Sequence, residues 1–172
     1  MEEAKLIKKC IKGDAKAQRV LFNRFAPKML GVCLRYAKNK NQAEDVLQEG
    51  FIKVFFNIKK FKGGSLEGWV RRIMVNTSLD EIRKNTKFKK NVSIENINEK
   101  EKNHILEGLM AQDILKIIKK MPSGYRVVFN LFAIEGYSHK EIAKKLGVSE
   151  STSKSQYFRA RAFLKKKIET TK

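Results

Sequence analysis

The chain has 172 residues, and its 38 Lys and Arg against 18 Asp and Glu give a formal net charge of +20 at pH 7. Hydrophobic residues make up 42% of the chain, which is enough to bury a core and excludes a wholly disordered protein. No apolar run approaches the ~18 residues that a membrane span needs, and the N-terminus lacks the pattern of a secretion signal, so a cytoplasmic protein without membrane insertion is expected.

The charge predicts a polyanionic partner, and nucleic acid is the leading interpretation. An acidic membrane surface is the rival, but no segment pairs a basic face with a continuous apolar one. A lysine-rich sequence can also reflect an AT-rich genome, in which case part of the excess charge is ordinary solvated surface. The composition therefore favours nucleic-acid binding without identifying its kind.

Local patterns predict helices along the first third of the chain. Asp14 is a candidate N-cap, and Pro27 ends or kinks the helix that begins there before a second helix follows. Asn41 and Glu44 have the spacing of a capping box, and the apolar residues within Val46–Ile58 then recur at a helical period. A third, longer helix is therefore expected.

The Lys62–Ser65 segment contains two glycines and breaks this long helix, and another helix is expected over about 66–84. Over about 88–103 apolar residues are sparse and the helical period fades, which is typical of a flexible linker. We therefore expect an all-α protein of two small helical domains joined by a linker, with boundaries at residues 1–90, 91–108 and 109–172.

Two helices open the C-terminal segment. The first contains the apolar residues of Ile114–Ile118 and ends before Pro122. Ser123 is a candidate cap for the second helix, and Gly136 closes it.

A helix-turn-helix pattern follows. Ser138 and Glu141 form a capping box for a short helix, Ala143 is small enough to let a second helix cross, and Gly147 permits a sharp turn before the cap Ser149. A plainer interpretation is two packed helices with a solvated basic face. The second helix offers a major groove the following base-reading and phosphate-holding types: Ser151, Thr152, Lys154, Ser155, Gln156, Phe158 and Arg159.

Acidic and amide residues cluster near the start of the long third helix, at Glu44, Asp45, Gln48 and Glu49. Carboxylates are favourable at any helix N-terminus, so local helix chemistry alone explains them. The alternative is a docking face for a basic partner protein.

The next helix places Arg72, Asn76 and Arg83 along one stripe, downstream of a loop that contains Lys62 and Ser65. Basic and amide groups beside such a loop suit an opened DNA strand, whose unstacked bases can be held. Trp69 is able to stack on a base, but its place in the apolar stripe favours core packing.

Three segments in this order resemble the sigma-70 family of RNA polymerase sigma factors, in its small two-domain extracytoplasmic-function (ECF) group. They are Ala43–Phe55, Phe61–Lys84 and Met121–Arg161. The resemblance implies a protein that binds core RNA polymerase, recognises the minus-thirty-five and minus-ten promoter elements, and promotes transcription initiation. Its implied partners are core polymerase and promoter DNA, with an anti-sigma factor as a further candidate.

The resemblance also implies roles for the residues above. Asp45, Gln48 and Glu49 match the polymerase-docking surface, and the Lys62–Ser65 loop and the helix with Asn76 match the minus-ten reader. The residues that match the minus-thirty-five recognition helix are Lys154, Ser155, Gln156, Phe158 and Arg159. Two residues depart from the family pattern. Ser153 stands where an apolar residue is usual, and Gln156 stands where a basic residue is common, so no promoter preference can be transferred.

Other classes of function have less support. His104 and His139 lack an evident catalytic partner, no Walker-type loop or metal-ligand set is present, and Cys10 and Cys33 read as reduced core residues, so neither an enzyme nor a cofactor is expected. The main alternative is a self-sufficient helix-turn-helix regulator that binds duplex DNA without polymerase.

Overall fold

The computed structural model describes residues 2–91 and 110–170, which are helical without a strand among them. The chain divides into two compact units, Met1–Ser93 and Ile94–Lys172. The prediction of an all-α protein with two helical parts is confirmed. The predicted linker over 91–108 lies, apart from Asn91, outside the described residues, and so do His104 and the predicted boundary between residues 108 and 109.

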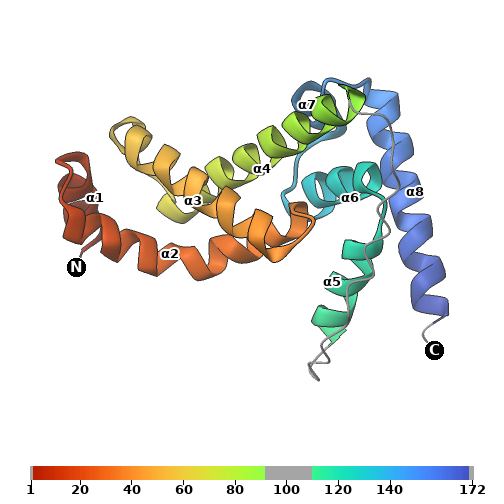
Figure 1. Cartoon of the computed structure of the whole chain (residues 1–172), viewed down its shortest axis with the longest axis horizontal. Helices are drawn as coiled ribbons and strands as arrows, with labels where there is room; N and C mark the ends of the chain where they lie inside the picture. Colours follow the sequence, from red (N-terminus) through yellow and green to blue (C-terminus); the bar gives the residue numbers. More distant parts are fainter. Residues whose placement is uncertain (1, 92–109, 171–172) are drawn as a thin grey trace. The chain divides into compact units, whose positions relative to one another are not determined.

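The helices follow one another as Figure 1 shows. The N-terminal unit contains α1 (Glu3–Ile11), α2 (Ala15–Tyr36), α3 (Lys40–Asn57), the 3-10 turn η1 (Ile58–Lys60) and α4 (Leu66–Asn91). The C-terminal unit contains α5 (Met110–Lys120), α6 (Ser123–Phe129), the π-helical turn η2 (Asn130–Ile134), α7 (His139–Leu146) and α8 (Glu150–Glu169).

Helix α2 continues through Pro27, so the prediction that two helices meet there is wrong. A proline inside a helix costs about 3 kcal/mol, because it removes one backbone hydrogen bond and crowds the preceding turn. Here its ring is exposed, while Leu21 and Phe25 before it and Met29 after it are buried on one continuous face. Burial of each such side chain contributes roughly 1.5–3 kcal/mol, which together outweighs the cost of the proline.

Three predicted helix ends also differ from the structure. The N-cap of α3 is Asn39, whose Oδ1 accepts a hydrogen bond from Gln42 N at 2.8 Å, and not Asn41. Ser123 is the first residue of α6 rather than its cap, and α4 extends to Asn91, beyond the predicted end at Lys84. The predicted caps Asp14, Ser138 and Ser149 are confirmed, each accepting a backbone N–H three residues on.

The core of the N-terminal unit lies between α2, α3 and α4, which contact one another. Met74 of α4 is fully buried and lies against Gly50 of α3, so closely that a Cβ built on Gly50 would be 2.9 Å from Met74 Cε. Cys10 and Cys33 are free and buried, as predicted, and burial raises the pKa of the Cys33 thiol to about 11. Both thiols are therefore inert packing groups at neutral pH.

In the C-terminal unit α8 packs against α6 and α7. Leu131, Ile142 and Ala160 are completely buried between these elements. The turn between α7 and α8 has Gly147 in the left-handed region at φ 67°, a conformation that glycine adopts without strain. The predicted helix-turn-helix is therefore confirmed as a structural element.

The two helical glycines Gly50 and Gly31 should respond to alanine in opposite ways. Gly50→Ala forces its methyl group into Met74 and is expected to destabilise the protein by about 1–3 kcal/mol. A methyl group on Gly31, in the interior of α2, would meet no described atom within 4 Å, so Gly31→Ala should stabilise by about 0.5–1 kcal/mol. Urea unfolding of both variants measures the change in the free energy of unfolding. Equal changes of the same sign in the two variants would contradict the close packing of α3 against α4.

Candidate protein and nucleic-acid interfaces

The predicted docking residues of α3 do not all share one face. Asp45 and Gln48 are exposed, three residues apart on the outer side of the helix. Glu49 is half-buried, with Oε1 2.9 Å from Lys53 Nζ and Oε2 3.9 Å from Lys84 Nζ. The structure therefore brings Asp45 and Gln48 together and turns Glu49 toward α4.

Two apolar residues extend the outer side of α3. Ile52 is 57% exposed and Phe56 is 77% exposed. They follow Asp45 and Gln48 at helical spacing, so the four residues form one surface, here called the α3 stripe. Sequence reasoning assigned no role to Ile52 and Phe56, because it considered only the apolar residues of this helix that recur on the core-facing side. The helical period of the buried residues indicates the exposure of Phe56, because Phe56 lies one position outside the buried face of α3.

A network of ion pairs holds the inner side of α3 to α4. Lys53 Nζ lies 3.4 Å from Asp80 Oδ2 as well as near Glu49, and Arg83 Nη1 donates to Asp80 Oδ1 at 2.9 Å. Burial alone lowers the pKa of Lys53, but the hydrogen bonds and charges of Glu49 and Asp80 raise it by more, so the ammonium stays charged. Arg83, a predicted DNA contact, is therefore engaged with Asp80, although its side chain is still partly exposed.

The predicted DNA-opening surface consists of a loop and the outer side of α4. Gly63 and Gly64 both have positive φ, 99° and 86°, which gives the loop its sharp turn. Ser65 Oγ accepts from Gly68 N at 3.0 Å and so caps α4. The side chains of Lys62 and Ser65 are exposed.

Arg72 and Asn76 are exposed one helical turn apart on α4, opposite the buried residues Val70 and Met74. They form a basic and amide pair on one face, as predicted from their spacing, and are here called the α4 pair. Trp69 is half-buried with its ring 5.7 Å from that of Phe61, edge to face. This contact favours the packing interpretation of Trp69 over base stacking.

The predicted DNA contacts of α8 lie on two sides of the helix. Thr152 Oγ1 is 2.7 Å from Ser149 Oγ within the cap, and Gln156 is turned inward beside Gly124 of α6. The Oε1 atom of Gln156 is buried and has no hydrogen-bond partner among the described residues. The remaining predicted residues are exposed: Ser151, Lys154, Ser155, Phe158 and Arg159, with Phe158 at 74%.

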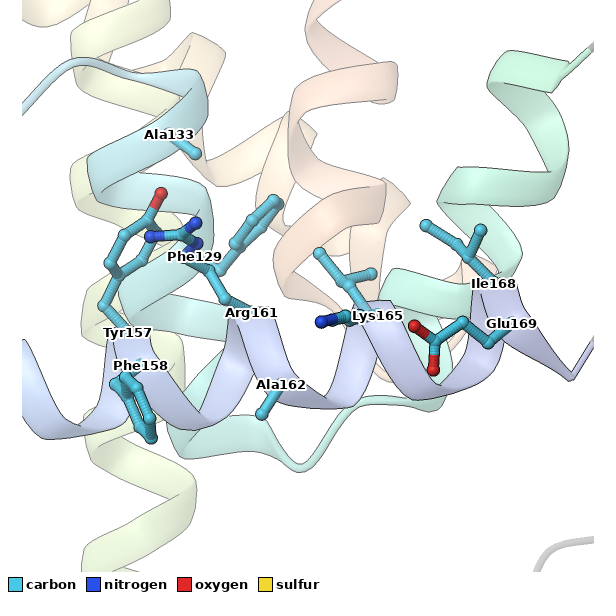
Figure 2. Close-up of a pocket in the computed structure, with 10 residues that line it drawn as sticks. Phe129, Ala133, Tyr157, Phe158, Arg161, Ala162, Lys165, Ile168 and Glu169 are labelled. Atoms are coloured by element: carbon cyan, nitrogen blue, oxygen red, sulfur yellow. The ribbon is translucent and has the colours of Figure 1, made fainter.

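A groove of about 850 Å³ runs between α8 and the α6–η2 segment. Figure 2 shows Phe129 and Ala133 facing the side chains that follow one another along α8. Its lining is largely apolar, with Arg161 and Lys165 as cations along α8. Sequence reasoning did not identify this groove, because it depends on how α6 and η2 pack against α8.

The part of the chain that is described holds no group of three or more His, Cys, Asp or Glu able to bind a metal ion. In the same residues, no helix combines the length and the apolar character that crossing a membrane requires. The candidate sites of the two units are their exposed surfaces: the α3 stripe, the α4 pair and the outer side of α8.

Family models match both units in order. The model described as Sigma-70 region 2 matches residues 21–88, and that described as Sigma-70, region 4 matches residues 111–164. The chain is 29% identical to the ECF RNA polymerase sigma-E factor of Haemophilus influenzae over 95% of this chain and 94% of that protein. It is 27% identical to the RNA polymerase sigma-H factor of Pseudomonas aeruginosa, over 98% and 94%.

Two solved structures share the fold. The sigma factor RpoE in complex with the anti-sigma factor NepR, from Bartonella quintana, matches with a TM-score of 0.56 at 22% identity, over 90% of this chain and 98% of that one. CnrH in complex with the cytosolic domain of CnrY matches with a TM-score of 0.52 at 20% identity, over 97% of both chains. With sigma-70 regions 2 and 4 in order and full-length ECF relatives, the chain belongs to the sigma-70 family, in its ECF group.

Proposed function

We propose that this protein is an ECF sigma factor that binds core RNA polymerase through the α3 stripe and recognises promoter DNA at two elements. In this proposal the outer side of α8 recognises the minus-thirty-five element. The Lys62–Ser65 loop and the α4 pair, Arg72 and Asn76, recognise and open the minus-ten element. The observation that carries it is the exposure of all three surfaces within the two matched sigma-70 regions.

The charge and chemistry of the exposed side chains support this assignment of each surface to its partner. The α3 stripe joins a carboxylate and an amide to two exposed apolar side chains, which suits a protein partner with a basic and apolar surface. The outer side of α8 offers Lys154 and Arg159, suited to phosphates and guanine edges. The chain acts in this role in the cytoplasm, where RNA polymerase works, and without catalysing a reaction.

An anti-sigma factor is a further proposed partner. Both similar solved structures are complexes: the sigma factor RpoE with the anti-sigma factor NepR, and CnrH with the cytosolic domain of CnrY. A reversible inhibitor of this kind would compete with polymerase for the same exposed surfaces.

The test of the function is transcription in vitro from a randomised promoter library. Core polymerase with this protein should select templates that share two spaced elements, and neither component should do so alone. The alternative, a self-sufficient helix-turn-helix regulator, predicts sequence-specific binding to duplex DNA in the absence of polymerase. It also leaves the exposed Ile52 and Phe56 without a role.

Asp45→Arg and Phe56→Ala should each weaken binding to core polymerase, by about tenfold or more if each is a central contact. Both side chains are exposed, so thermal unfolding should be nearly unchanged. Glu2→Arg, an exposed charge reversal at the start of the chain, is the matched control. Normal polymerase affinity of both folded variants would exclude the α3 stripe.

Arg159→Ala should relax the sequence preference at the upstream element, with a cost of about 1–3 kcal/mol for one lost base contact. If Lys154 contacts a phosphate, Lys154→Ala should instead weaken binding to all DNA sequences alike. It should also reduce the slope of log affinity against log salt concentration by about one. Gln156→Ala should leave the preference as it was, because that side chain is turned inward. Selection from the promoter library measures all three, and unchanged selection by Arg159→Ala would remove α8 as the reader.

Asn76→Ala should reduce the preference for single-stranded over duplex minus-ten DNA, since an amide offers a base edge both a donor and an acceptor. Capture of an unstacked base is worth about 1–3 kcal/mol. Arg72→Ala should weaken both forms alike through a lost phosphate contact. Fluorescence anisotropy of the full chain, with oligonucleotides that lack the upstream element and at one salt concentration, tests this. Equal loss on both forms for Asn76→Ala would leave α4 as a phosphate-binding surface only.

A further inference from the structure

Two residues without a role in the proposed contacts meet inside the helix-turn-helix. His139 is the first residue of α7, and Ser153 lies on the inner side of α8 with no exposed surface. Their side chains are joined by a hydrogen bond, with 2.9 Å between His139 Nδ1 and Ser153 Oγ. His139, for which the sequence shows no evident partner, and Ser153 are therefore partners of each other.

Aromatic contacts hold the histidine ring in place. It stacks on Phe132 of η2 with 4.3 Å between ring centroids and 13° between planes. Tyr157 of α8 lies 4.5 Å from Phe132 and 5.8 Å from His139, tilted against both rings. The imidazole is thus enclosed by residues from two other elements, and its Nδ1 atom has a defined direction toward α8.

A hydrogen bond in this position constrains α8 more sharply than an apolar contact would. An apolar residue at position 153 tolerates small rotations and shifts of the helix, because dispersion contacts are non-directional. The hydrogen bond is directional, and a buried hydroxyl that loses it must find another partner or remain unsatisfied. Rotation of α8 about its axis is therefore opposed at Ser153.

Two basic residues near Ser153 on the same helix face outward. Lys154 follows it directly, and Arg159 lies on the outer side within the next two turns. Their positions relative to a major groove depend on the rotation of α8 about its axis. A base contact requires hydrogen-bond geometry within a few tenths of an ångström, so a small rotation removes it while leaving phosphate attraction in place.

We propose that His139 and Ser153 are a positioning pair that sets the orientation of α8 for reading the upstream promoter element. The proposal rests on the function proposed above and adds a determinant of specificity that does not touch DNA. Its distinctive consequence is that the pair controls discrimination between sequences more than overall affinity for DNA.

The variants follow from the geometry. Ser153→Ala removes the hydroxyl, and His139→Phe keeps a ring to stack on Phe132 but removes the nitrogen. Ser153→Thr keeps the hydroxyl and is the conservative rescue. Ser78→Ala in α4 is the matched control, because it removes another buried hydroxyl, bonded to Met74 O at 2.9 Å, from the other unit.

The measurement is the ratio of transcription from promoters with intact and altered upstream elements, using full-length protein with core polymerase. Each single variant should lower this ratio by roughly tenfold, the size of one lost base contact. Ser153→Thr should keep the ratio near that of the unsubstituted protein. The double variant, His139→Phe with Ser153→Ala, should lose no more than either single one, because both remove the same hydrogen bond.

Two outcomes overturn the proposal. One is a ratio that stays unchanged in folded Ser153→Ala and His139→Phe proteins, which would make the pair a packing feature. The other is an equal fall of the ratio in Ser78→Ala, which would make any loss of stability sufficient. Failure of the function itself is distinguishable, since the unsubstituted protein would then show no discrimination with polymerase.

Discussion

The back-to-back packing of α3 and α4 is the contact on which the N-terminal interfaces depend. Gly50 removes a side chain where Met74 needs the space, so the two helices approach closely and bury their inner faces against each other and α2. Their outer faces are then left exposed and carry the α3 stripe and the α4 pair, for which we propose a protein partner and a DNA strand. Any loosening at Gly50 would move the two surfaces relative to each other.

The ion pairs at the edge of this contact also fix the position of α3 relative to α4. Lys53 lies between Glu49 of its own helix and Asp80 of α4, and Asp80 in turn holds Arg83. Partly exposed pairs of this kind add little stability, on the order of 0–1 kcal/mol each. Their effect is geometric, because they hold Lys53 of α3 beside Asp80 of α4.

Local signals in the sequence predicted most of the fold correctly, but they failed where residues far apart in the sequence determine the structure. Caps at Asp14, Ser138 and Ser149 act within one turn and were predicted. The prediction at Pro27 was wrong because the local cost of a proline is visible in the sequence, whereas the continuous buried face that outweighs this cost is not.

The candidate sites follow the same rule. Exposure follows from helical period at Asp45, Arg72 and Arg159, whereas Glu49 is drawn inward partly by Lys84 of α4, and Gln156 is packed beside Gly124 of α6. Lys84 and Gly124 lie far along the chain from the residues that they contact.

The large positive charge explains why orientation matters in the C-terminal unit. A chain with net charge +20 is attracted to any DNA, since phosphate contacts supply affinity without sequence information. In the proposed function, selectivity then depends on the few exposed side chains of α8 that would contact base edges, and such contacts form only in one orientation of the helix. A purely apolar contact would hold α8 against α6 and α7 equally well. The hydrogen bond between the buried Ser153 and the stacked His139 makes this contact directional. Reading base edges requires a defined orientation of the helix, whereas general attraction to phosphate does not.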